Sequence, residues 1–237
     1  MTPVRPAYQY YRILWQSLDW LFPPKCGGCG RMGKRWCDSC DQLTHCLPSP
    51  VCQSCGIPIG FGNLCRQCEG TPTRYKALRS YTEFSGPVRN ALNRLKYKHD
   101  IALGECLAKM LIVYYESLNW KMDLIIPVPL GVARLQNRGY NQAALLARPL
   151  ALATGIYYQP QALQRIKDTP TQVGLSASKR KSNVLSAFRA DEEYVRGKNV
   201  LIVDDVATSG ATVDACADAL LHANAASVYC LTLARTI

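Results

Sequence analysis

The sequence predicts an α/β protein in which helices flank a parallel sheet, with a cysteine-rich domain in front of it. Three observations point to this fold class: apolar runs alternate with helical stretches after residue 73, nine of the 12 cysteines fall in residues 26–68, and 48% of the 237 residues are hydrophobic against 19% charged. Strands that alternate with helices are typical of a parallel sheet covered on both faces. The composition excludes a disordered chain.

Residues 1–24 are expected to hold an amphipathic helix. Its apolar residues are interrupted by Gln16, Ser17 and Asp19, and no small-residue cleavage site follows them. We therefore predict neither a signal peptide nor a membrane span in this segment.

Residues 25–72 are expected to form a double zinc ribbon. They contain four C-x-x-C pairs, and each pair can place two thiolates on one side of a tight turn, so that two pairs complete a tetrahedral zinc site. Iron–sulfur clusters and redox-active dithiols are the alternatives to zinc. The predicted metal ligands are Cys26, Cys29, Cys37, Cys40, Cys52, Cys55, Cys65 and Cys68.

Two zinc sites, each built from consecutive pairs, are the arrangement that we favour, while interleaved pairing and a single occupied site stay open. The zinc is expected to be structural, because four thiolates leave no position for substrate or water. His45 and Cys46 lie between the two ribbons and are interpreted as an inert linker pair, with His45 as a substitute ligand the alternative. Reduced thiolates indicate the cytoplasm.

Residues 73–237 are expected to form the α/β domain. In chain order, the predicted elements are helices at residues 86–97 and 101–118, a buried strand at 124–128, a helix at 141–154, a buried strand at 200–203, a helix at 212–223 and a strand at 228–233. Pro149 lies inside the helix predicted at 141–154 and is a small departure from a regular helical pattern near its end.

The net charge of +11 favours polyanionic partners such as phosphates or nucleic acid. Residues 1–73 carry 7 Lys and Arg against 4 Asp and Glu, and residues 74–237 carry 21 against 13, so most of the excess lies in the larger part. A solvated basic surface without a partner is the alternative.

The segment VLIVDDVATSGAT, residues 200–212, places two carboxylates directly after the apolar strand. Ligands bind at the carboxyl ends of the strands in parallel sheets, and small residues at a helix start let backbone N–H groups approach a phosphate. Because Asp204 and Asp205 would repel a phosphate, we expect them to face ribose hydroxyls or a magnesium ion. The ligand implied is a sugar phosphate. A simple helix N-cap, the alternative, explains one carboxylate only.

This segment is similar to the signature of the type I phosphoribosyltransferase fold, which binds phosphoribosyl pyrophosphate. Together with the cysteine pairs, the runs IIPVPLGVARLQNRGYNQ (residues 125–142) and TPTQVGLSASKRKSNVLSAF (residues 169–188) resemble the ComF/GntX family of competence-associated proteins. The resemblance covers nearly all of residues 20–236. It implies a type I phosphoribosyltransferase-like sheet behind the zinc ribbon domain.

The resemblance also implies a role for each part of the site. Asp204 and Asp205 would hold the ribose hydroxyls, Arg134 would lie on the pyrophosphate side, and Arg138 and Asn141 would support the pyrophosphate loop or reach the ligand. For this run, a simple strand-to-helix connection with surface arginines is the alternative. The residues implied to cradle the ligand are Ala207, Thr208, Ser209, Gly210, Ala211 and Thr212 for the 5-phosphate, and Val128, Pro129, Leu130 and Gly131 for the pyrophosphate.

Residues 169–183 correspond to a loop that closes over the site in active members of this fold. Gln172, Lys179, Arg180 and Lys181 are candidates to cover the pyrophosphate, and a solvated basic loop is the alternative. Departure of pyrophosphate leaves positive charge on the sugar ring and adds negative charge to the leaving group, so carboxylates near the ribose and cations near the pyrophosphate both stabilise the transition state. The catalytic candidates are Asp204, Asp205, Arg134 and Arg180.

The resemblance favours a competence-associated protein that binds phosphoribosyl pyrophosphate with magnesium and handles single-stranded DNA during DNA uptake, alongside other DNA-uptake proteins. Such binding needs basic tracks and aromatic side chains, and two groups of residues provide them: Arg31, Lys34, Arg35 and Trp36, and Arg94, Lys96, Tyr97 and Lys98.

The alternative is a magnesium-dependent phosphoribosyltransferase, a glycosyltransferase, acting on an unidentified base or amine. Residues 75–98, with Tyr81 among them, are then the candidate hood over the nucleophile, and packing with a basic surface is the other interpretation of this region. An interaction adaptor that keeps the fold without a ligand is a third possibility, since fold does not establish turnover.

Overall fold

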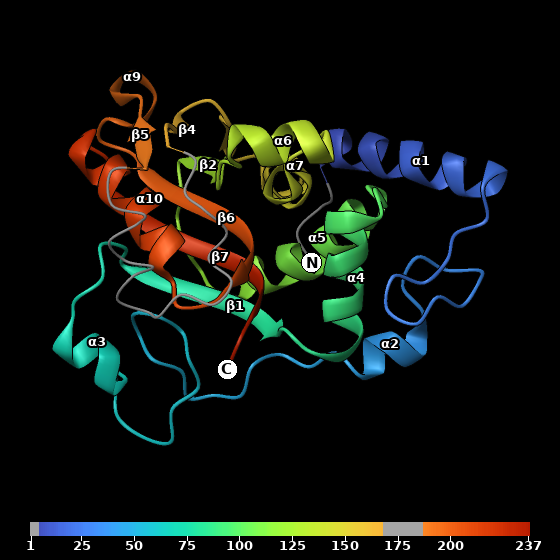
Figure 1. The fold of residues 1–237 in the computed structure, drawn as a ribbon, viewed down its shortest axis with the longest axis horizontal. Helices are drawn as coiled ribbons and strands as arrows, with labels where there is room; N and C mark the ends of the chain where they lie inside the picture. Colours follow the sequence, from blue (N-terminus) through green and yellow to red (C-terminus); the bar gives the residue numbers. More distant parts are fainter. Residues whose placement is uncertain (1–4, 168–186) are drawn as a thin grey trace.

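A five-stranded parallel sheet forms the centre of the protein (Figure 1). The computed structural model describes residues 5–167 and 187–237. All neighbouring strands of the sheet are parallel, which confirms the predicted fold class. In spatial order the strands are β1 (Ala77–Glu83), β7 (Ser227–Arg235), β6 (Asn199–Ala207), β2 (Leu124–Pro127) and β3 (Tyr157–Tyr158).

The central strands are apolar along their whole buried length because both faces of the sheet are covered. In β6, Val200 and Ile202 belong to the hydrophobic cluster on one face, and Leu201 and Val203 belong to the cluster on the other. This alternation follows from the two-residue period of a strand. The run at residues 200–203 was therefore correctly predicted as a buried strand.

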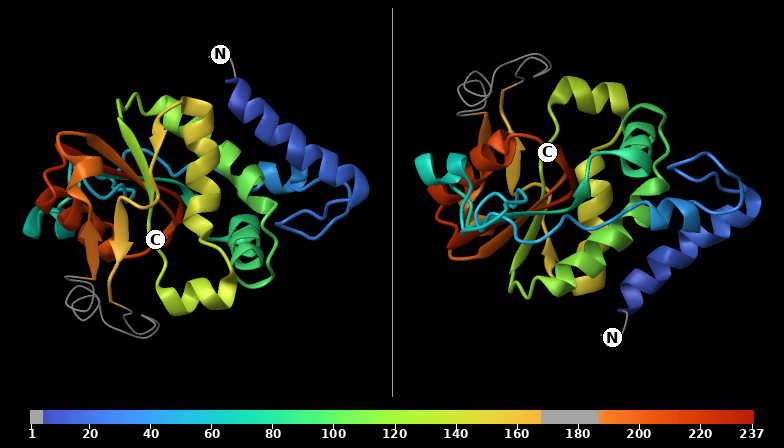
Figure 2. Two further views of the ribbon diagram at one scale, coloured as in Figure 1. Left: turned by 90° about the horizontal axis from the view of Figure 1, so that it is seen from above. Right: turned by 90° about the horizontal axis from the view of Figure 1, so that it is seen from below.

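Figure 2 shows the helices on the two sides of the sheet. One face packs against α10 (Ala211–His222) and an antiparallel strand pair, and the other face packs against a helical layer. The layer consists of α4 (Gly86–Tyr97), α5 (Leu103–Ser117) and α7 (Gln142–Thr154), and the strand pair is β4 (Leu163–Arg165) and β5 (Phe188–Ala190), followed by α9 (Glu192–Val195). A further helix, α6 (Val132–Arg138), follows β2 and buries none of its residues.

One predicted strand is longer than the apolar run from which it was predicted. The strand predicted at residues 200–203 continues through the aspartate pair to Ala207, because Asp204 stays in register with Thr232 of β7. The hydrogen-bonded ladder extends beyond the apolar run from which the strand was predicted. Pro149 lies inside α7 without ending it, and the helix ends at Thr154, the last residue of the predicted run.

The cysteine-rich segment forms two small units on opposite sides of the molecule, marked by the short helices α2 (Asp38–Gln42) and α3 (Arg66–Gly70) in Figure 1. Between them the chain runs along the outer edge of β1, where Cys46 forms an antiparallel bridge with Thr82. This cover protects an edge strand that would otherwise present unpaired backbone groups.

The helix α1 (Pro6–Leu21) lies alongside α7. Its inward face carries Tyr8, which is 5% exposed, whereas Leu14 and Trp20 are exposed. Along the described part of the chain, we find no helix with the length and apolar character needed to span a bilayer.

Candidate functional site

The aspartate pair lies near the carboxyl end of β6, within the strand. Asp205 is 4% exposed, and its Oδ2 lies 2.5 Å from Nζ of Lys96 on α4. Adjacent residues of a strand point to opposite faces, and Asp204 accordingly lies on the side of α10, where its charge acts on the Cys216 thiol. The two carboxylates are therefore in different environments.

Lys96 forms an ion pair with Asp205 but not with Asp204. Burial, together with the neighbouring charge of Asp205, raises the pKa of Asp204 well above its ordinary value. Burial lowers the pKa of Lys96, but the attraction of Asp205 outweighs this effect and leaves the Lys96 pKa raised. A cation or a hydroxyl donor next to Asp204 would stabilise its ionised form. Carboxylate oxygens are ligands that magnesium prefers, so the carboxylate of Asp204, which lies on the opposite face from the Lys96–Asp205 ion pair, fits that ion.

The loop after the pair turns directly into α10. Gly210 has φ of +78° and is the N-cap residue of the helix, a backbone conformation that side chains other than glycine rarely adopt. Thr208 and Ser209 are exposed, and Ser209 Oγ accepts a hydrogen bond from the N–H of Ala211 at 3.5 Å. The turn thus exposes hydroxyl groups and the N–H groups of a helix start, which together suit an anion.

The second predicted loop, Val128, Pro129, Leu130 and Gly131, connects β2 to α6 beside β6. The N–H of Val128 donates to the carbonyl of Val203 at 2.8 Å, and the side chain of Asn141 donates to the carbonyl of Val128 at 2.9 Å. Asn141 also caps α7 by accepting from the N–H of Ala143. Of the two roles expected for Asn141, support of this loop is the one that the structure shows.

The two arginines of this region differ. Arg138 donates to Gln142 Oε1 at 2.5 Å and its guanidinium lies 5.6 Å from the ring centre of Tyr97. Arg134 is half-buried on α6 and forms no ion pair with another described residue. Arg134 is therefore available to an anion, whereas Arg138 is used in packing. Residues 169–183, which include Gln172, Lys179, Arg180 and Lys181, lie outside the described residues.

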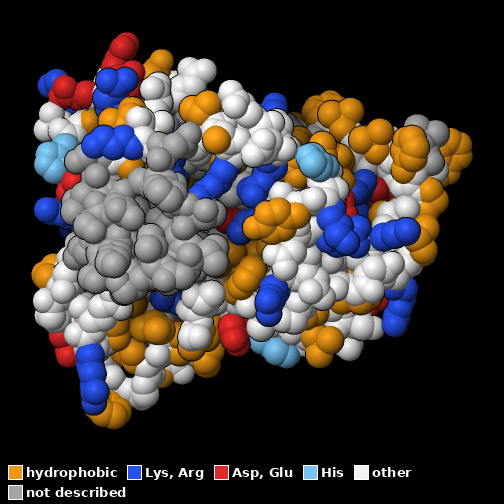
Figure 3. Space-filling model, viewed as in Figure 1, with side chains coloured by type: hydrophobic (Ala, Val, Ile, Leu, Met, Phe, Trp, Pro, Cys, Tyr) orange, Lys and Arg blue, Asp and Glu red, His pale blue; other side chains and the backbone are white. Residues whose placement is uncertain are grey.

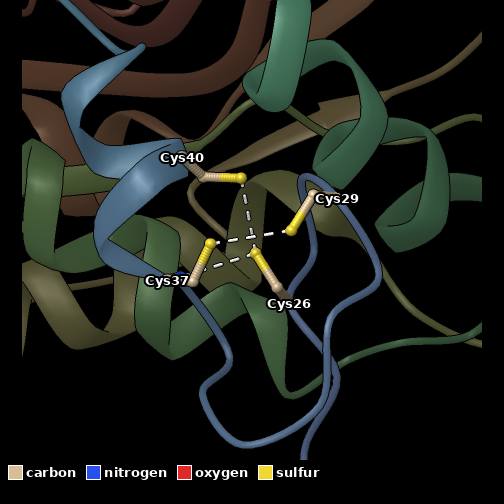
Figure 4. Close-up of side chains that lie close together, drawn as sticks. All are labelled: Cys26, Cys29, Cys37 and Cys40. Carbon is tan, nitrogen blue, oxygen red and sulfur yellow. Dashed lines mark hydrogen bonds between the residues drawn. The ribbon is translucent and has the colours of Figure 1, made fainter.

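The eight predicted metal ligands form two groups of four, built from consecutive pairs. Within each group all the sulfur atoms lie within 4.8 Å of one another. The distance from Cys26 Sγ to Cys40 Sγ and that from Cys29 Sγ to Cys37 Sγ are both 3.6 Å (Figure 4). Four sulfurs at about 2.3 Å from a zinc ion stand about 3.8 Å apart in a tetrahedron. The two groups are thus four-cysteine zinc sites with sequential pairing, which excludes interleaving.

Backbone groups favour the thiolate form of the first cysteine of each site. Burial raises the pKa of Cys26, but backbone N–H groups, including that of Cys37, outweigh it and lower the pKa to about 6. In the second site the same balance lowers the pKa of Cys52 to about 7. These thiols ionise more readily than free cysteine, and the thiolate is the form that binds zinc.

The basic surface expected to meet DNA is partly occupied by internal contacts. Arg35 forms an ion pair with Asp19 on α1, Arg94 pairs with Asp100 at 2.6 Å, and Lys96 pairs with Asp205. Figure 3 shows basic side chains scattered among apolar ones on the helical side of the molecule. The exposed residues that stay available are Arg31, Lys34, Tyr97 and Lys98, although Lys34 contacts Asp38.

Sequence reasoning did not link Lys96 or Tyr75 to this site and missed Arg235 altogether. Lys96 and Tyr75 lie in the segment predicted as a hood, residues 75–98, because no sequence pattern pairs these residues with a strand more than 100 residues later. Arg235 follows the apolar run of β7, and it is only 4% exposed. A charged residue at the end of a buried strand was the available signal.

Comparisons with known proteins agree with the geometry. A phosphoribosyl transferase domain model matches residues 99–236, and a double zinc ribbon domain model matches residues 17–69. Fold and site thus define a phosphoribosyltransferase-fold protein preceded by a double zinc ribbon.

Three curated relatives extend this assignment. The chain is 36% identical to the DNA utilization protein YhgH of Salmonella typhi over 79% of this chain and 85% of the relative. It is 28% identical to Competence protein F of Haemophilus influenzae, over 75% and 80% of the two chains, and 27% identical to Competence protein ComFC of Bacillus subtilis, over 94% and 90%. The chain belongs to the ComF/GntX family.

Proposed function

We propose that the protein binds phosphoribosyl pyrophosphate with magnesium at the carboxyl edge of its sheet and acts on single-stranded DNA in a competence-related process. The observation that carries the ligand proposal is the meeting of the aspartate pair of β6 with the Gly210 turn that opens α10. The names of the relatives, which refer to DNA utilization and competence, support the second part.

In this proposal the side chains divide by charge. Asp204 and Asp205 hold the ribose hydroxyls, and the loop from Ala207 to Thr212 receives the 5-phosphate through backbone N–H groups and hydroxyls. The loop from Val128 to Gly131 holds the pyrophosphate, with Arg134 beside it and Arg180 as the cation that covers it. Magnesium, when bound, supplies positive charge between the carboxylates and the phosphates.

Calorimetric titration with phosphoribosyl pyrophosphate and magnesium tests the ligand. We expect binding by the native protein and a loss of affinity of about tenfold or more in Asp204→Asn and Asp205→Asn, which corresponds to about 1.4 kcal/mol or more. Glu116→Gln, an exposed position on α5, removes the same charge away from the site and serves as the control. Equal affinity in all four proteins would refute the assigned roles.

Fluorescence anisotropy with a labelled single strand tests the second part. Binding through Lys and Arg releases counterions, so the logarithm of the affinity should fall linearly with the logarithm of the salt concentration, by about 0.7 for each phosphate neutralised. Tyr97→Ala should weaken binding by removing an exposed stacking surface that is worth about 1–3 kcal/mol per base. Absence of binding, or binding that does not respond to salt, would remove this role.

Catalytic turnover is the second candidate function. It is favoured by the charge arrangement, with carboxylates on β6 and, near the adjacent loop, Arg134, which forms no ion pair within the described part of the chain. Both signs of charge are needed when pyrophosphate departs. The test is release of pyrophosphate across a panel of bases and amines, in the native protein and in Asp205→Asn. Release that needs Asp205 and depends on one acceptor would establish a transferase. No release with any acceptor would support a binding protein.

A further inference from the structure

We infer that Arg235 is a positioning residue that couples the second zinc site (Cys52, Cys55, Cys65 and Cys68) to the phosphate loop, so that zinc binding and ligand binding favour each other. The inference rests on the proposed function, because it takes the loop from Ala207 to Thr212 as the place of the 5-phosphate. It assigns the second ribbon a role in ligand binding beyond folding its own segment.

The second ribbon and the phosphate loop line one cavity. Its volume is about 150 Å³, and its walls include Cys55 and Cys65 on one side and Thr208 and Ser209 on the other. Tyr75 forms part of the same wall, and its hydroxyl lies 3.1 Å from the point where a side chain on Gly210 would begin. With Cys68, three of the four ligands of the second zinc site line the same cavity as the turn that would receive a phosphate.

Arg235 joins these two walls. It lines the cavity, and its Nη1 donates to the backbone carbonyl of Cys55. The next residue, Thr236, donates its N–H to the carbonyl of Ala207 at 3.0 Å, where the phosphate loop starts. Two consecutive residues at the end of β7 thus hold the ribbon on one side and the loop on the other.

The guanidinium of Arg235 is not fully satisfied. The residue is 4% exposed, and its Nε has no hydrogen-bond partner among the described residues. A buried donor of a charged group without an acceptor is costly. An anion bound at the phosphate loop, or the loop held in place by that anion, would supply the missing acceptor for Arg235. This would stabilise the orientation in which Arg235 also donates to the carbonyl of Cys55.

A second set of contacts ties the ribbon to the helix behind the loop. The N–H of Arg74 donates to Asp214 Oδ1 at 2.6 Å, and its Nε lies 3.0 Å from Asp218 Oδ1. Both acids belong to α10, whose first residue follows Gly210. The chain that leaves the second ribbon therefore contacts the helix that presents the loop.

Zinc fixes the ribbon residue that Arg235 contacts. The knuckle after Cys55 lies directly on β1, where a side chain on Gly56 would begin 2.3 Å from the carbonyl oxygen of Leu78. The N–H of Leu78 donates to the carbonyl of Ser54 at 2.7 Å. Since metal binding supplies much of the folding energy of such modules, loss of zinc would release the Cys55 carbonyl from Arg235.

The first ribbon provides a comparison within the same chain. It contacts the helical layer, through Asn90 to the carbonyl of Gly28 at 2.9 Å and through Arg94 to the carbonyl of Cys26 at 2.9 Å. Figure 1 shows the two ribbons far apart, with α2 beside α4 and α3 on the other side. The coupling is therefore expected at the second zinc site, not at the first.

Coupling between two binding equilibria is reciprocal, which gives a readout that does not depend on activity. Zinc affinity is measured by equilibrium competition with a chromophoric chelator, with and without phosphoribosyl pyrophosphate and magnesium. Cys37→Ser in the full chain disables the first site, so that the second site is observed alone; Cys65→Ser gives the reverse. Magnesium pyrophosphate, which lacks the sugar, controls for zinc binding by the ligand.

We expect the ligand to raise zinc affinity at the second site about fivefold or more and to leave the zinc affinity of the first site unchanged.

Two arginine variants separate positioning from simple stability. Arg235→Met should abolish the effect of ligand on zinc affinity. Arg79→Met is the matched control, because Arg79 also donates to second-ribbon carbonyls, those of Cys52 and Gln53, but does not line the cavity. It should keep the coupling. Arg235→Lys, which retains the charge but loses the fork of donors, should restore part of it.

The outcomes distinguish this inference from the function on which it rests. No calorimetric binding of the ligand by the intact protein would overturn both. Binding without a change in zinc affinity at the second site would overturn the coupling alone. Equal loss of coupling in Arg79→Met and Arg235→Met would overturn the role of Arg235.

Discussion

The ion pair between Lys96 and Asp205 compensates one of the two neighbouring negative charges at the site. The side chain of Lys96 is 18% exposed and that of Asp205 is 5% exposed, so water contributes little to either charge. Removing one partner of a buried pair leaves the other charge uncompensated. The α4 helix thus supports the site through a single side chain.

Lys96→Met is therefore expected to destabilise the folded protein by about 3 kcal/mol, as measured by urea unfolding. Lys109→Met is the matched control, because Lys109 pairs with Glu105 at 3.4 Å and is 45% exposed; it should change stability by no more than about 1 kcal/mol. Asp205→Asn added to Lys96→Met should recover part of the loss, since it removes the stranded charge. An additive double variant would show that the pair does not interact.

Asp204 gives a prediction about pH. Burial and the charge of Asp205 raise the pKa of Asp204 in the folded protein. In the unfolded chain the pKa of an aspartate is about 3.9. The folded protein is therefore destabilised as the pH rises from the unfolded-state pKa through the folded-state pKa, because Asp204 ionises less readily when folded. Asp204→Asn removes this destabilisation. The asparagine keeps a side-chain oxygen that can accept the hydrogen bond from the N–H of Asp205, which Asp204 Oδ1 accepts at 2.8 Å.

We expect Asp204→Asn to have a higher melting temperature than the native protein, with a difference that increases as the pH rises through the folded-state pKa of Asp204. Scanning calorimetry of the zinc-loaded proteins measures this. Glu193→Gln, which removes an exposed acid on α9, should show no such trend. A difference that grows as the pH falls would contradict the sign of the Asp204 shift.

At the scale of helices and strands, local sequence patterns predicted the elements whose formation depends on nearby residues. The helix at residues 86–97 was predicted with both of its observed ends, because its opening Gly86–Pro87 and its apolar spacing are local features. The extension of β6 through the aspartate pair depends on its pairing with β7, so composition could not predict it. The edge strand β1, which pairs with the distant β7, is a further element that local apolar runs had not revealed.

The candidate site divides in the same way. The aspartates, the Gly210 turn and the cysteine pairs are contiguous motifs, and their chemistry follows from residue type and spacing. Lys96, Tyr75 and Arg235 reach their places only when the sheet brings distant segments together. Long-range contacts of this kind leave no periodic pattern in one sequence.

The knuckle of the second ribbon provides a test at this scale. Gly56 has φ of +71°, and an added Cβ would lie 2.3 Å from the carbonyl oxygen of Leu78. Gly56→Ala should therefore destabilise the protein by about 1–3 kcal/mol and reduce zinc retention at the second site. Gly60→Ala is the control in the same ribbon, because nothing lies within 4 Å of its added Cβ; it should stay within about 0.5 kcal/mol of the native protein. Equal effects at both glycines would contradict the close docking of the knuckle on β1.

At the scale of the whole molecule, the two ribbons lie on the sheet domain without forming its core. In the described structure, no buried member of the hydrophobic clusters on the two sheet faces comes from residues 25–72. Trp36 is the one ribbon residue that packs against the helical cluster, and it is only partly buried. The sheet domain thus has its own apolar core, while the ribbons depend on metal.

Zinc removal should therefore unfold the ribbons while the sheet domain stays folded. We expect metal analysis to give two zinc ions per chain, one for each group of four cysteines. After chelation under reducing conditions, the far-UV circular dichroism of the sheet and its helices should largely persist, because β2, β6 and α7 pack together through apolar side chains. The melting temperature should fall, since β1 and α4 lose their contacts with the ribbons. Readdition of zinc is the control and should restore it. Loss of all secondary structure on chelation would mean that the ribbons are part of the folding core, and the independence of the sheet domain would be wrong.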